Sequence, residues 1–525
     1  MLRPTAYQPP TELDETIFAA TVDPDHYLRR VQQAVNFEPC RDLLAAAYCP
    51  DQGRPAVEPL LLLKLEFLAY HYNLSDRHVI QQARCHMAFR WFLGLSLHSA
   101  LPHHTLLTYF RERLGPERHQ QLFDAIVGQA RAKGLVKDRL RLKDATHVLA
   151  NIAIPSTIAL IAQTRRRLLQ ALQPLAASRV AEEQQRAEAI RLATADLSGE
   201  ERLLQRVAHL RAVVAWAKEV PGQAEFPVQP ADLQEALTSA LDLAVKVLAD
   251  REDPDGADHV VSAYDPDARL GKHGEYFVGY MLDVAMDAHS QIVTALNVLP
   301  FRGVAAEAQD AVTLLAQEEQ AHGNDVQALS MDSAGFQGET LRALTAPGGP
   351  QVEVYVPPKE EPPTGLFTAA DFALDATGQV LTCPGGQTTD RKRPSYRNTG
   401  WKFAFARVTC AACPLQAQCL TALPQKEGRT VIKNHHEEEY RAARARAQTP
   451  AYQAVRREHP AIERKLGEMV RWHGGRRARY RGRGRVRVQA LWTGLVVNVK
   501  RIVALTAGLL AAGQGTLRAE LAATG

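Results

Sequence analysis

The sequence predicts a mixed α+β protein that is divided into several domains. Its 525 residues exceed the usual size of one domain. Strand-like and helix-like segments alternate between residues 138 and 357, in the order strand, helical insertion, two strands, helix, strand, helix, strand. That order predicts a mixed sheet with helices packed on it. A third observation is a Pro-, Gly- and Thr-rich stretch, residues 358–435, that interrupts the helices and carries four cysteines.

The N-terminal part is predicted to be helical. Residues 1–25 hold prolines and acidic residues and are expected to form an arm, whereas PLLLLKLEFLAYHYNL has the composition of a buried helix. Two shorter helices are expected in SDRHVIQQARCHMAFRWFLGL, with Ser75 as its N-cap, and in ALPHHTLLTYFRERLG. The pair fits a helix-turn-helix, and it fits a plain helical bundle equally well.

The strands of the sheet are read from alternating or continuous apolar runs. The first, DRLRLKDATHVLA, is expected to end near Asp144, and VQALSMDSAGF is expected to end at Asp332. EYFVGYMLDVAMD and QIVTALNVLPF are predicted to form a hairpin. The segments around residues 305–320 and 338–346 have helical character, and VEVYVPP closes the sheet as another strand.

The composition of the remaining segments sets the domain boundaries. The residues after 157 are rich in Ala, Leu, Arg and Glu, which favours long surface helices. The predicted units are an arm (1–25), a helical DNA-binding domain (26–135), a sheet domain (136–156 and 257–357), a helical insertion (157–256), a Cys-rich insert (358–435), and C-terminal helices with a basic segment (436–525).

Charge and hydropathy limit the classes of function. The formal net charge is only +4, so the chain as a whole is not a polybasic binder, but arginine is concentrated after Arg441. The N-terminus has no long apolar run of the kind found in signal peptides, and IVALTAGLLAAG is too short to span a bilayer. We therefore expect a cytoplasmic protein with no membrane partner.

Three carboxylates are candidates for one metal site. Asp144 and Asp332 stand at the ends of two predicted strands, where the following loop exposes a side chain on a rigid base. Each also fits a turn-forming or capping role. In the predicted helix IERKLGEMVRW, Glu463 and Glu468 flank an apolar stripe, and periodicity does not choose between them. The alternative is that both glutamates are solvated partners of arginines.

Four of the seven cysteines lie close together in the sequence: Cys383, Cys410, Cys413 and Cys419. The CAAC segment places two thiolates on one metal ion, and four sulfurs suit a tetrahedral structural Zn²⁺ site. Such a site would hold together an insert that lacks its own apolar core. Free thiols in a reducing compartment are the alternative.

A dense basic stretch, RRARYRGRGRVRVQ, follows the two glutamates. Arginine forks suit bidentate contact with phosphates, which predicts DNA binding rather than a solvated surface. The alternation in RGRGRVRVQ also fits a strand with arginines on one face. The residues expected to contact DNA are Arg471, Arg476, Arg477, Arg479, Arg481, Arg483, Arg485, Arg487, Lys500 and Arg501.

Taken in this order, these segments resemble the bacterial insertion-sequence transposases of the DDE class. The resemblance covers most of the chain. It rests on LSDRHVIQQARCHMAFRWFLGL with HTLLTYFRERLG, then KDATHVLAN, YDPDARLGKHGEYFVGYMLDVAMD, MDSAGF, CPGG with CAACPLQAQC, and finally IERKLGEM, RRARYRG and NVKR. Each piece is weak alone, whereas their order and separations together are fairly specific.

The resemblance implies a ribonuclease H-like core with Asp144, Asp332 and Glu463 as the metal-binding carboxylates. It selects Glu463 over Glu468, and it implies Mg²⁺ or Mn²⁺ as cofactor, DNA as substrate and a homo-oligomer during synapsis. The implied reactions are strand cleavage at the element ends and strand transfer into target DNA, carried out near the nucleoid. In the DPDA segment, Asp265 and Asp267 are expected to have a turn role.

One departure from the family pattern bears on activity. Relatives commonly have Lys seven residues after the glutamate, and this chain has Val470, followed by Arg471. The family's upstream Arg is replaced by His459, with Arg456 slightly earlier. A catalytically inactive, transposase-derived DNA-binding protein is therefore the alternative. A zinc-dependent regulator unrelated to transposition is a third reading, which the Pro-rich context of the cysteines disfavours.

Overall fold

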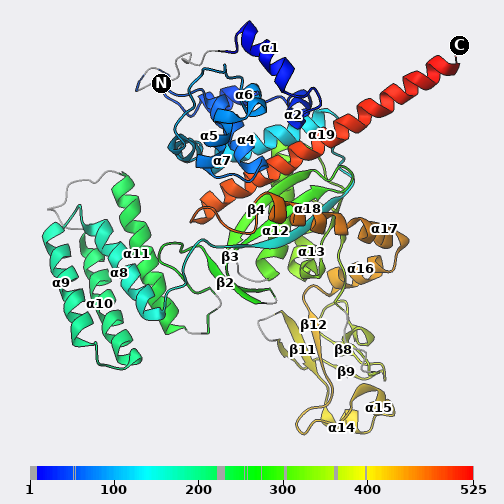
Figure 1. The fold of residues 1–525 in the computed structure, drawn as a ribbon. Coiled ribbons are helices and arrows are strands. Elements are labelled where there is room, and N and C mark those ends of the chain that lie inside the picture. Colours follow the sequence, from blue (N-terminus) through cyan, green and yellow to red (C-terminus); the bar gives the residue numbers. More distant parts are fainter. Residues whose placement is uncertain are drawn as a thin grey trace.

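The computed structural model describes residues 9–50, 52–53, 55–220, 231–253, 255–256, 258–273, 275–300, 304–359, 365–395 and 399–523. It is a mixed α+β structure, as the sequence predicts. Figure 1 shows a central sheet with the N-terminal helices above it, a separate group of helices to one side and a small β-rich module below.

The N-terminal helices form one bundle that shares its core with the sheet domain. α4 is buried on most of its surface because other helices surround it, and Leu65, Phe67 and Tyr70 are fully buried. The expected arm contains α1, whose Phe18 is also fully buried; residues 1–8 lie outside the described ranges. The helices are α1 (Glu12–Thr21), α2 (Tyr27–Ala34), α3 (Cys40–Ala45), α4 (Pro59–His71), α5 (Asp76–Cys85), α6 (Met87–Leu93) and α7 (Thr105–Ala132).

The central sheet has six strands. They are β1 (Arg141–Leu149), β2 (Arg269–His273), β3 (Glu275–Asp287), β4 (Val293–Pro300), β5 (Ala328–Ser330) and β6 (Glu353–Tyr355). Their order is β2-β3-β1-β5-β6, and β4 also pairs with β3. The pairs that β3 makes with β1, β2 and β4 are antiparallel, whereas β1–β5 and β5–β6 are parallel. The predicted hairpin is thus confirmed as β3 and β4.

The first strand is longer than the sequence indicates. β1 stays paired with β3 up to the Leu149↔Gly279 pair, so Asp144, opposite Val284, lies in the middle of β1. The prediction that this strand ends near Asp144 is therefore wrong. The alternation that marks a strand stops at the polar residues, but pairing with β3 carries the strand on.

Helices cover both faces of the sheet. On β4, Ala295 packs with Leu314 of α12 (Val304–His322). The next residue, Leu296, belongs to the main core and lies beside Gly494 of α19 (Arg483–Ala523). Because successive strand residues point to opposite faces, α12 and α19 lie on opposite sides of the sheet. The other helices around the sheet are α13 (Gly338–Thr345), α16 (Glu437–Ala447), α17 (Pro450–Glu458) and α18 (Pro460–Trp472).

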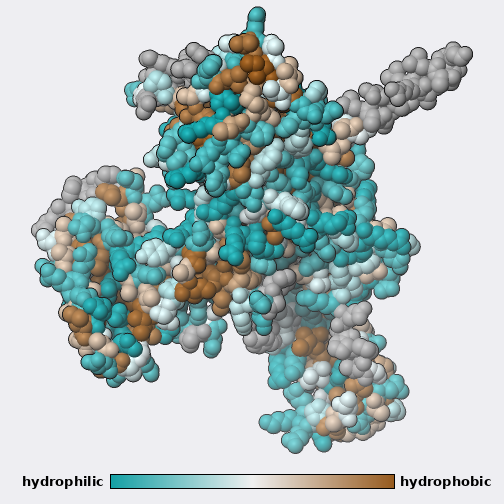
Figure 2. Space-filling model, viewed as in Figure 1, coloured by the Kyte–Doolittle hydropathy of each residue, from teal (hydrophilic) through white to brown (hydrophobic). Residues whose placement is uncertain are grey.

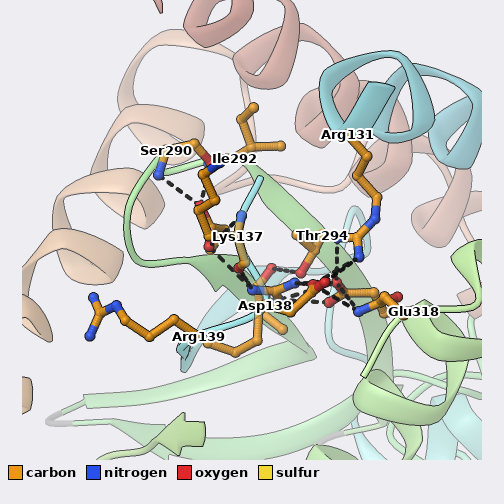
Figure 3. Close-up of polar contacts among 12 residues, drawn as sticks. Arg131, Lys137, Asp138, Arg139, Ser290, Ile292, Thr294 and Glu318 are labelled. Carbon is orange, nitrogen blue, oxygen red and sulfur yellow. Dashed lines mark hydrogen bonds and ion pairs between the residues drawn. The ribbon is translucent and has the colours of Figure 1, made fainter. Parts of the chain in front are cut away.

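A buried ion-pair network fixes the start of β1. Arg141 is fully buried and donates to Glu318 of α12 at 2.5 Å and 2.9 Å, to Asp287 at 3.2 Å and to Asp138 at 2.9 Å. Arg131 of α7 also donates to Asp138, and Figure 3 shows Arg131, Asp138 and Glu318 converging. The network ties α7, α12 and the β3–β4 turn to β1, three residues before Asp144.

Glu318→Ala is expected to lower the free energy of unfolding by about 3–5 kcal/mol, because it removes the closest carboxylate partner of the buried Arg141 charge. Chemical denaturation followed by circular dichroism measures this change. The exposed pair of Arg191 and Glu188, with an N···O distance of 2.5 Å, supplies the control: Glu188→Ala is expected to cost less than about 1 kcal/mol. Equal losses in the two variants would contradict the role of the network.

Two further units project from the sheet domain. The helical insertion has its own core, with Leu168, Leu210 and Ala244 fully buried, and consists of α8 (Thr157–Leu172), α9 (Ala177–Ala193), α10 (Gly199–Glu219) and α11 (Ala231–Glu252). In its described residues, the cysteine-bearing module has two small sheets, two short α-helices and one 3₁₀ turn (Ala369–Asp371). Its elements are β7 (Ala373–Leu374), β8 (Leu381–Thr382), β9 (Thr388–Thr389), β10 (Lys392–Pro394), β11 (Gly400–Ala404), α14 (Arg407–Ala411), α15 (Gln416–Cys419) and β12 (Thr430–Asn434).

The basic stretch leads into the long C-terminal helix, so RGRGRVRVQ is helical from Arg483 and does not form the alternative strand. The DPDA segment lies at the start of that helix: Asp265 accepts from the Gly482 amide at 3.1 Å, and Asp267 accepts from the Arg483 amide at 3.0 Å. Both acids thereby satisfy otherwise unpaired amides at a helix N-terminus.

Among the described residues, one helical segment, Arg483–Gly508, is long and apolar enough to cross a membrane by composition. Two thirds of its apolar window (67%) is buried inside the protein. Its packing against α7 and β4 explains that apolarity, as in the core helix of a globular domain.

Candidate metal centre

Three carboxylates meet at the open edge between β1 and β5. One oxygen from each of Asp144, Glu307 and Asp332 lies within 4.8 Å of the others. Asp144 comes from β1, Asp332 follows β5, and Glu307 comes from the first turn of α12. The structure thus brings the two predicted aspartates together and adds a glutamate that the sequence analysis did not single out.

The register of the parallel strands explains why the two aspartates meet. β1 and β5 pair through Arg141↔Leu329 and Leu142↔Ser330. Asp144 lies two residues beyond Leu142, and Asp332 lies two residues beyond Ser330, so the aspartates occupy equivalent positions just past the last paired residues. Asp332 is further fixed as the N-cap of a short 3₁₀ turn, where its Oδ1 accepts from the Ala334 amide at 2.9 Å.

The donor set fits a hard divalent cation. Three carboxylates supply only oxygen ligands, which Mg²⁺ and Mn²⁺ prefer. Oxygens on opposite sides of one Mg²⁺ are about 4.2 Å apart, so small side-chain movements suffice to place these three around one or two ions. Burial raises the pKa of Asp144 to about 7, the Ala145 amide opposes this, and the nearby Asp332 and Glu307 carboxylates add to it. A bound cation removes that repulsion.

The raised pKa predicts how stability depends on pH without metal. The folded-state pKa of Asp144 is about 7, above the ordinary value of 3.8. The protonated carboxyl therefore stabilises the folded state at low pH, and this contribution is lost as the pH rises from about 4 to about 7. In EDTA, Tm is expected to fall between pH 5 and pH 7.5, and less so in Asp144→Asn. Thermal unfolding checks this, and an identical fall in both proteins would exclude Asp144 as the cause.

Among the described residues, neither Glu463 nor Glu468 belongs to this group of clustered carboxylates. Glu463 is exposed on the first turn of α18, which packs along β1, and among the described residues it joins no cluster with metal-site spacing. Its role as a ligand stays a prediction. Glu468 has two lysine partners, Lys500 at 2.6 Å and Lys465 at 2.9 Å. Those contacts make it a structural ion-pair residue.

The residues upstream of Glu463 contact β5 next to the site. Arg456 of α17 donates to the Met331 carbonyl at 2.8 Å, and His459 lies 3.0 Å from the Ser330 hydroxyl. Both contacts hold the end of β5, from which Asp332 projects. This chain has His459 where the family has an arginine, but Arg456 still lies beside the residue that precedes Asp332.

The backbone of the basic stretch is hydrogen-bonded to the end of β1, and several of its side chains contact other parts of the protein. The Leu149 amide donates to the Arg476 carbonyl and the Ala478 amide donates to the Leu149 carbonyl, both at 2.8 Å. Several predicted DNA-binding residues donate to protein groups: Arg476, Arg479, Arg481, Arg485, Arg487, Lys500 and Arg501. Within the predicted DNA-binding set, the exposed residues are Arg471, Arg477, Arg481, Arg483 and Arg485.

A recess lies where this stretch meets the N-terminal bundle, lined by Arg111, Tyr480 and Arg485 among others. Arg111 is held by Glu66 and Asp76, each at 2.5 Å. Arg479 lies 4.5 Å from the centre of the Tyr70 ring and donates to Asn73. The N-terminal helices and the basic stretch thus pack against each other and line a common recess.

The four clustered cysteines lie near one another in the Cys-rich module, but among the described residues they form no group with the close spacing that Asp144, Glu307 and Asp332 have. Cys383, Cys410, Cys413 and Cys419 line one small pocket and form no disulfide. A Cβ built on Gly385 would lie 3.4 Å from the Cys413 sulfur and 3.7 Å from the Cys383 sulfur. The Arg429 amide donates to the Cys410 sulfur at 3.3 Å. Burial raises the pKa of Cys419, and the other three cysteines add to the shift.

Comparison with known proteins adds two matches to protein families. Residues 17–113 match the family described as "Transposase domain (DUF772)", and residues 382–503 match the family described as "Transposase DDE domain". The second range contains Glu463 and the four cysteines, whereas Asp144 and Asp332 lie outside both ranges. No curated protein and no solved structure matches the chain. Two separate parts of the chain are therefore similar to transposase domains, and these two matches support an insertion-sequence transposase of the DDE class.

Proposed function

We propose that the protein cleaves DNA strands at the ends of an insertion sequence and transfers them into target DNA, using divalent metal. The observation that carries this proposal is the convergence of Asp144, Asp332 and Glu307 at β1, the strand whose end the basic stretch joins. The mixed sheet, with one long antiparallel pair and two parallel pairs around β1 and β5, supports the ribonuclease H-like core that the resemblance implies.

The three carboxylates would hold Mg²⁺ or Mn²⁺, and such an ion would supply charge stabilisation for the attacking and leaving oxygens of an in-line displacement at phosphorus. Asp144 and Asp332 supply ligands from two rigid strands, so their separation is set by the sheet. Glu307 supplies a third ligand from α12. Glu463 is proposed as a further ligand, reaching the same edge from α18 when DNA and metal bind.

The exposed arginines of the basic stretch are proposed to hold the DNA backbone. The stretch pairs with Leu149, five residues after Asp144, which places it about 17 Å along the strand from the aspartate. DNA lying across it would therefore reach the carboxylates within roughly half a helical turn. The N-terminal helices share this surface and are proposed to contact the same DNA. We place the protein in the cytoplasm with chromosomal DNA as partner and expect a homo-oligomer at synapsis.

The cysteines are proposed to bind one structural Zn²⁺. Four sulfurs around a small pocket suit tetrahedral coordination, and an amide that donates to a sulfur is a common support for a metal-bound thiolate. The module's apolar core contains few buried residues, including Phe372, Leu381 and Phe403. A metal would supply the stability that such a small core lacks.

A cleavage assay tests the proposed activity. Purified protein is incubated with DNA carrying the ends of its element, in Mg²⁺ or in EDTA. Cleavage is expected in Mg²⁺ only, and Asp332→Asn is expected to remove it while leaving DNA binding in a mobility-shift assay within about threefold. Binding without cleavage by the wild-type protein in Mg²⁺ and in Mn²⁺ would overturn the proposal. That outcome would favour the inactive DNA-binding alternative, for which Val470 is the main argument.

A further inference from the structure

Lys143, the residue immediately before Asp144, is buried beneath the metal centre. Its side chain is 3% exposed, and its Nζ lies 3.0 Å from Asp283 Oδ1 and 3.6 Å from Glu307 Oε1. Burying an ammonium group is costly unless anions compensate it. Here one partner is a structural carboxylate of β3, and the other is a candidate metal ligand.

The geometry of the sheet explains this position. Lys143 and Asp144 are successive residues of β1, so their side chains leave on opposite faces. Lys143 shares its face with Asp283, which lies on the paired strand, and this is the face that α12 covers. Glu307 on α12 approaches the two aspartates from that face, at the edge where β1 no longer pairs with β5.

The Lys143 ammonium is itself firmly held. Asp283 is fully buried, and Asp310, on the next turn of α12 after Glu307, accepts from Asn297 at 2.9 Å. The carboxyl groups of Asp283 and Glu307 compensate this buried ammonium group. A fixed cation on one side of Glu307 and two carboxylates on the other define where the glutamate side chain lies.

We propose that Lys143 is a positioning residue of the metal centre, which holds Glu307 of α12 in place as a ligand. The proposal rests on the proposed function, because it assumes that Asp144, Asp332 and Glu307 bind metal. Lys143 touches neither metal nor DNA and acts through Glu307. Removing it is expected to weaken metal binding even where folding is intact.

The test separates positioning from stability by removing the buried ion pair as a pair. Lys143→Met alone leaves the buried Asp283 carboxylate without its partner. Lys143→Met is therefore combined with Asp283→Asn, which removes both charges of the pair. Asp283→Asn alone, which keeps Lys143 and Glu307, is the matched control. Mn²⁺ binding to the full-length protein is measured by electron paramagnetic resonance, and thermal unfolding is followed in EDTA.

The paired substitution is expected to weaken Mn²⁺ binding by about 10- to 100-fold, the range for lost outer-shell contacts, whereas Asp283→Asn changes it by less than about threefold. In a Glu307→Gln background the same pair is expected to add less than about twofold, because Lys143 acts through Glu307. Unchanged Mn²⁺ affinity in the paired variant, or an equal loss in both backgrounds, overturns the proposal. Lys143→Gln with Asp283→Asn serves if the methionine variant does not fold.

Asp332→Asn distinguishes failure of this inference from failure of the proposed function. If Asp332→Asn binds Mn²⁺ as tightly as the wild type, the metal centre itself is refuted. If Asp332→Asn loses Mn²⁺ and the Lys143 variants do not, the centre stands and Lys143 is only a structural ion pair.

Discussion

Glu307→Gln is expected to lower the rate of Mg²⁺-dependent strand cleavage by about 1,000-fold. The amide keeps the shape of the side chain but removes one of three charges that converge within 4.8 Å. A metal ion contributes several kcal/mol of charge stabilisation in the transition state, and about 4 kcal/mol corresponds to three orders of magnitude in rate. Single-turnover cleavage of end-bearing DNA measures the effect, with Mn²⁺ affinity as a second readout.

Two control variants make this result specific. Glu319→Gln changes a glutamate on the same helix, outside the cluster, and is expected to leave cleavage within about twofold. Glu463→Gln tests the ligand implied by the family resemblance. If both Glu307→Gln and Glu463→Gln lose activity, four carboxylates share the site. If Glu307→Gln cleaves normally and Glu463→Gln does not, Glu307 is a bystander.

Removal of zinc is expected to unfold the Cys-rich module. A structural Zn²⁺ contributes about 10–16 kcal/mol of apparent binding free energy in small zinc domains, which this module's few buried apolar residues do not replace. Cys413→Ser is expected to remove about one Zn²⁺ per chain by elemental analysis and to open the residues around 365–435 to protease. Cleavage there is expected within minutes, while the central sheet stays protected.

Cys85→Ser is the matched control, because Cys85 is exposed and lies outside the cluster. It is expected to keep its zinc and its protease resistance. A wild-type protein that is purified without zinc, binds none when it is added and keeps a protected module would show that the four thiols are not a metal site.

Much of the fold and part of the site were predictable from sequence, for identifiable reasons. The β3–β4 hairpin and the α12 helix carry strong local patterns. The parallel register that aligns Asp144 with Asp332 depends on which strands pair, and the sequence does not show this. Glu307 was missed because an acidic residue in the first turn of a helix is the ordinary partner of its dipole. Only the folded structure, in which the pairing of β1 with β5 stops before the two aspartates, shows that Glu307 faces them.

The basic stretch shows what the sequence did not reveal about arginine contacts. Its density predicts a partner of opposite charge, but sequence does not show which guanidinium groups the protein itself uses. Arg479 donates to Asn73 across the bundle, and Arg476 donates to the His147 carbonyl at 2.7 Å. Lys500 neutralises Glu468, which leaves Glu463 as the candidate of that helix. Long-range contacts of this kind leave no periodic signal in the sequence.

The most direct test of the central claim is a crystal structure of the protein with Mn²⁺, read from the anomalous scattering of the metal. The account predicts one or two anomalous peaks between Asp144, Asp332 and Glu307, with oxygen–metal distances near 2.1–2.2 Å. It also predicts that the peaks vanish in Asp332→Asn. Saturating Mn²⁺ with no peak at these carboxylates, or with peaks only elsewhere, would contradict the assignment of this edge of the sheet as the metal centre.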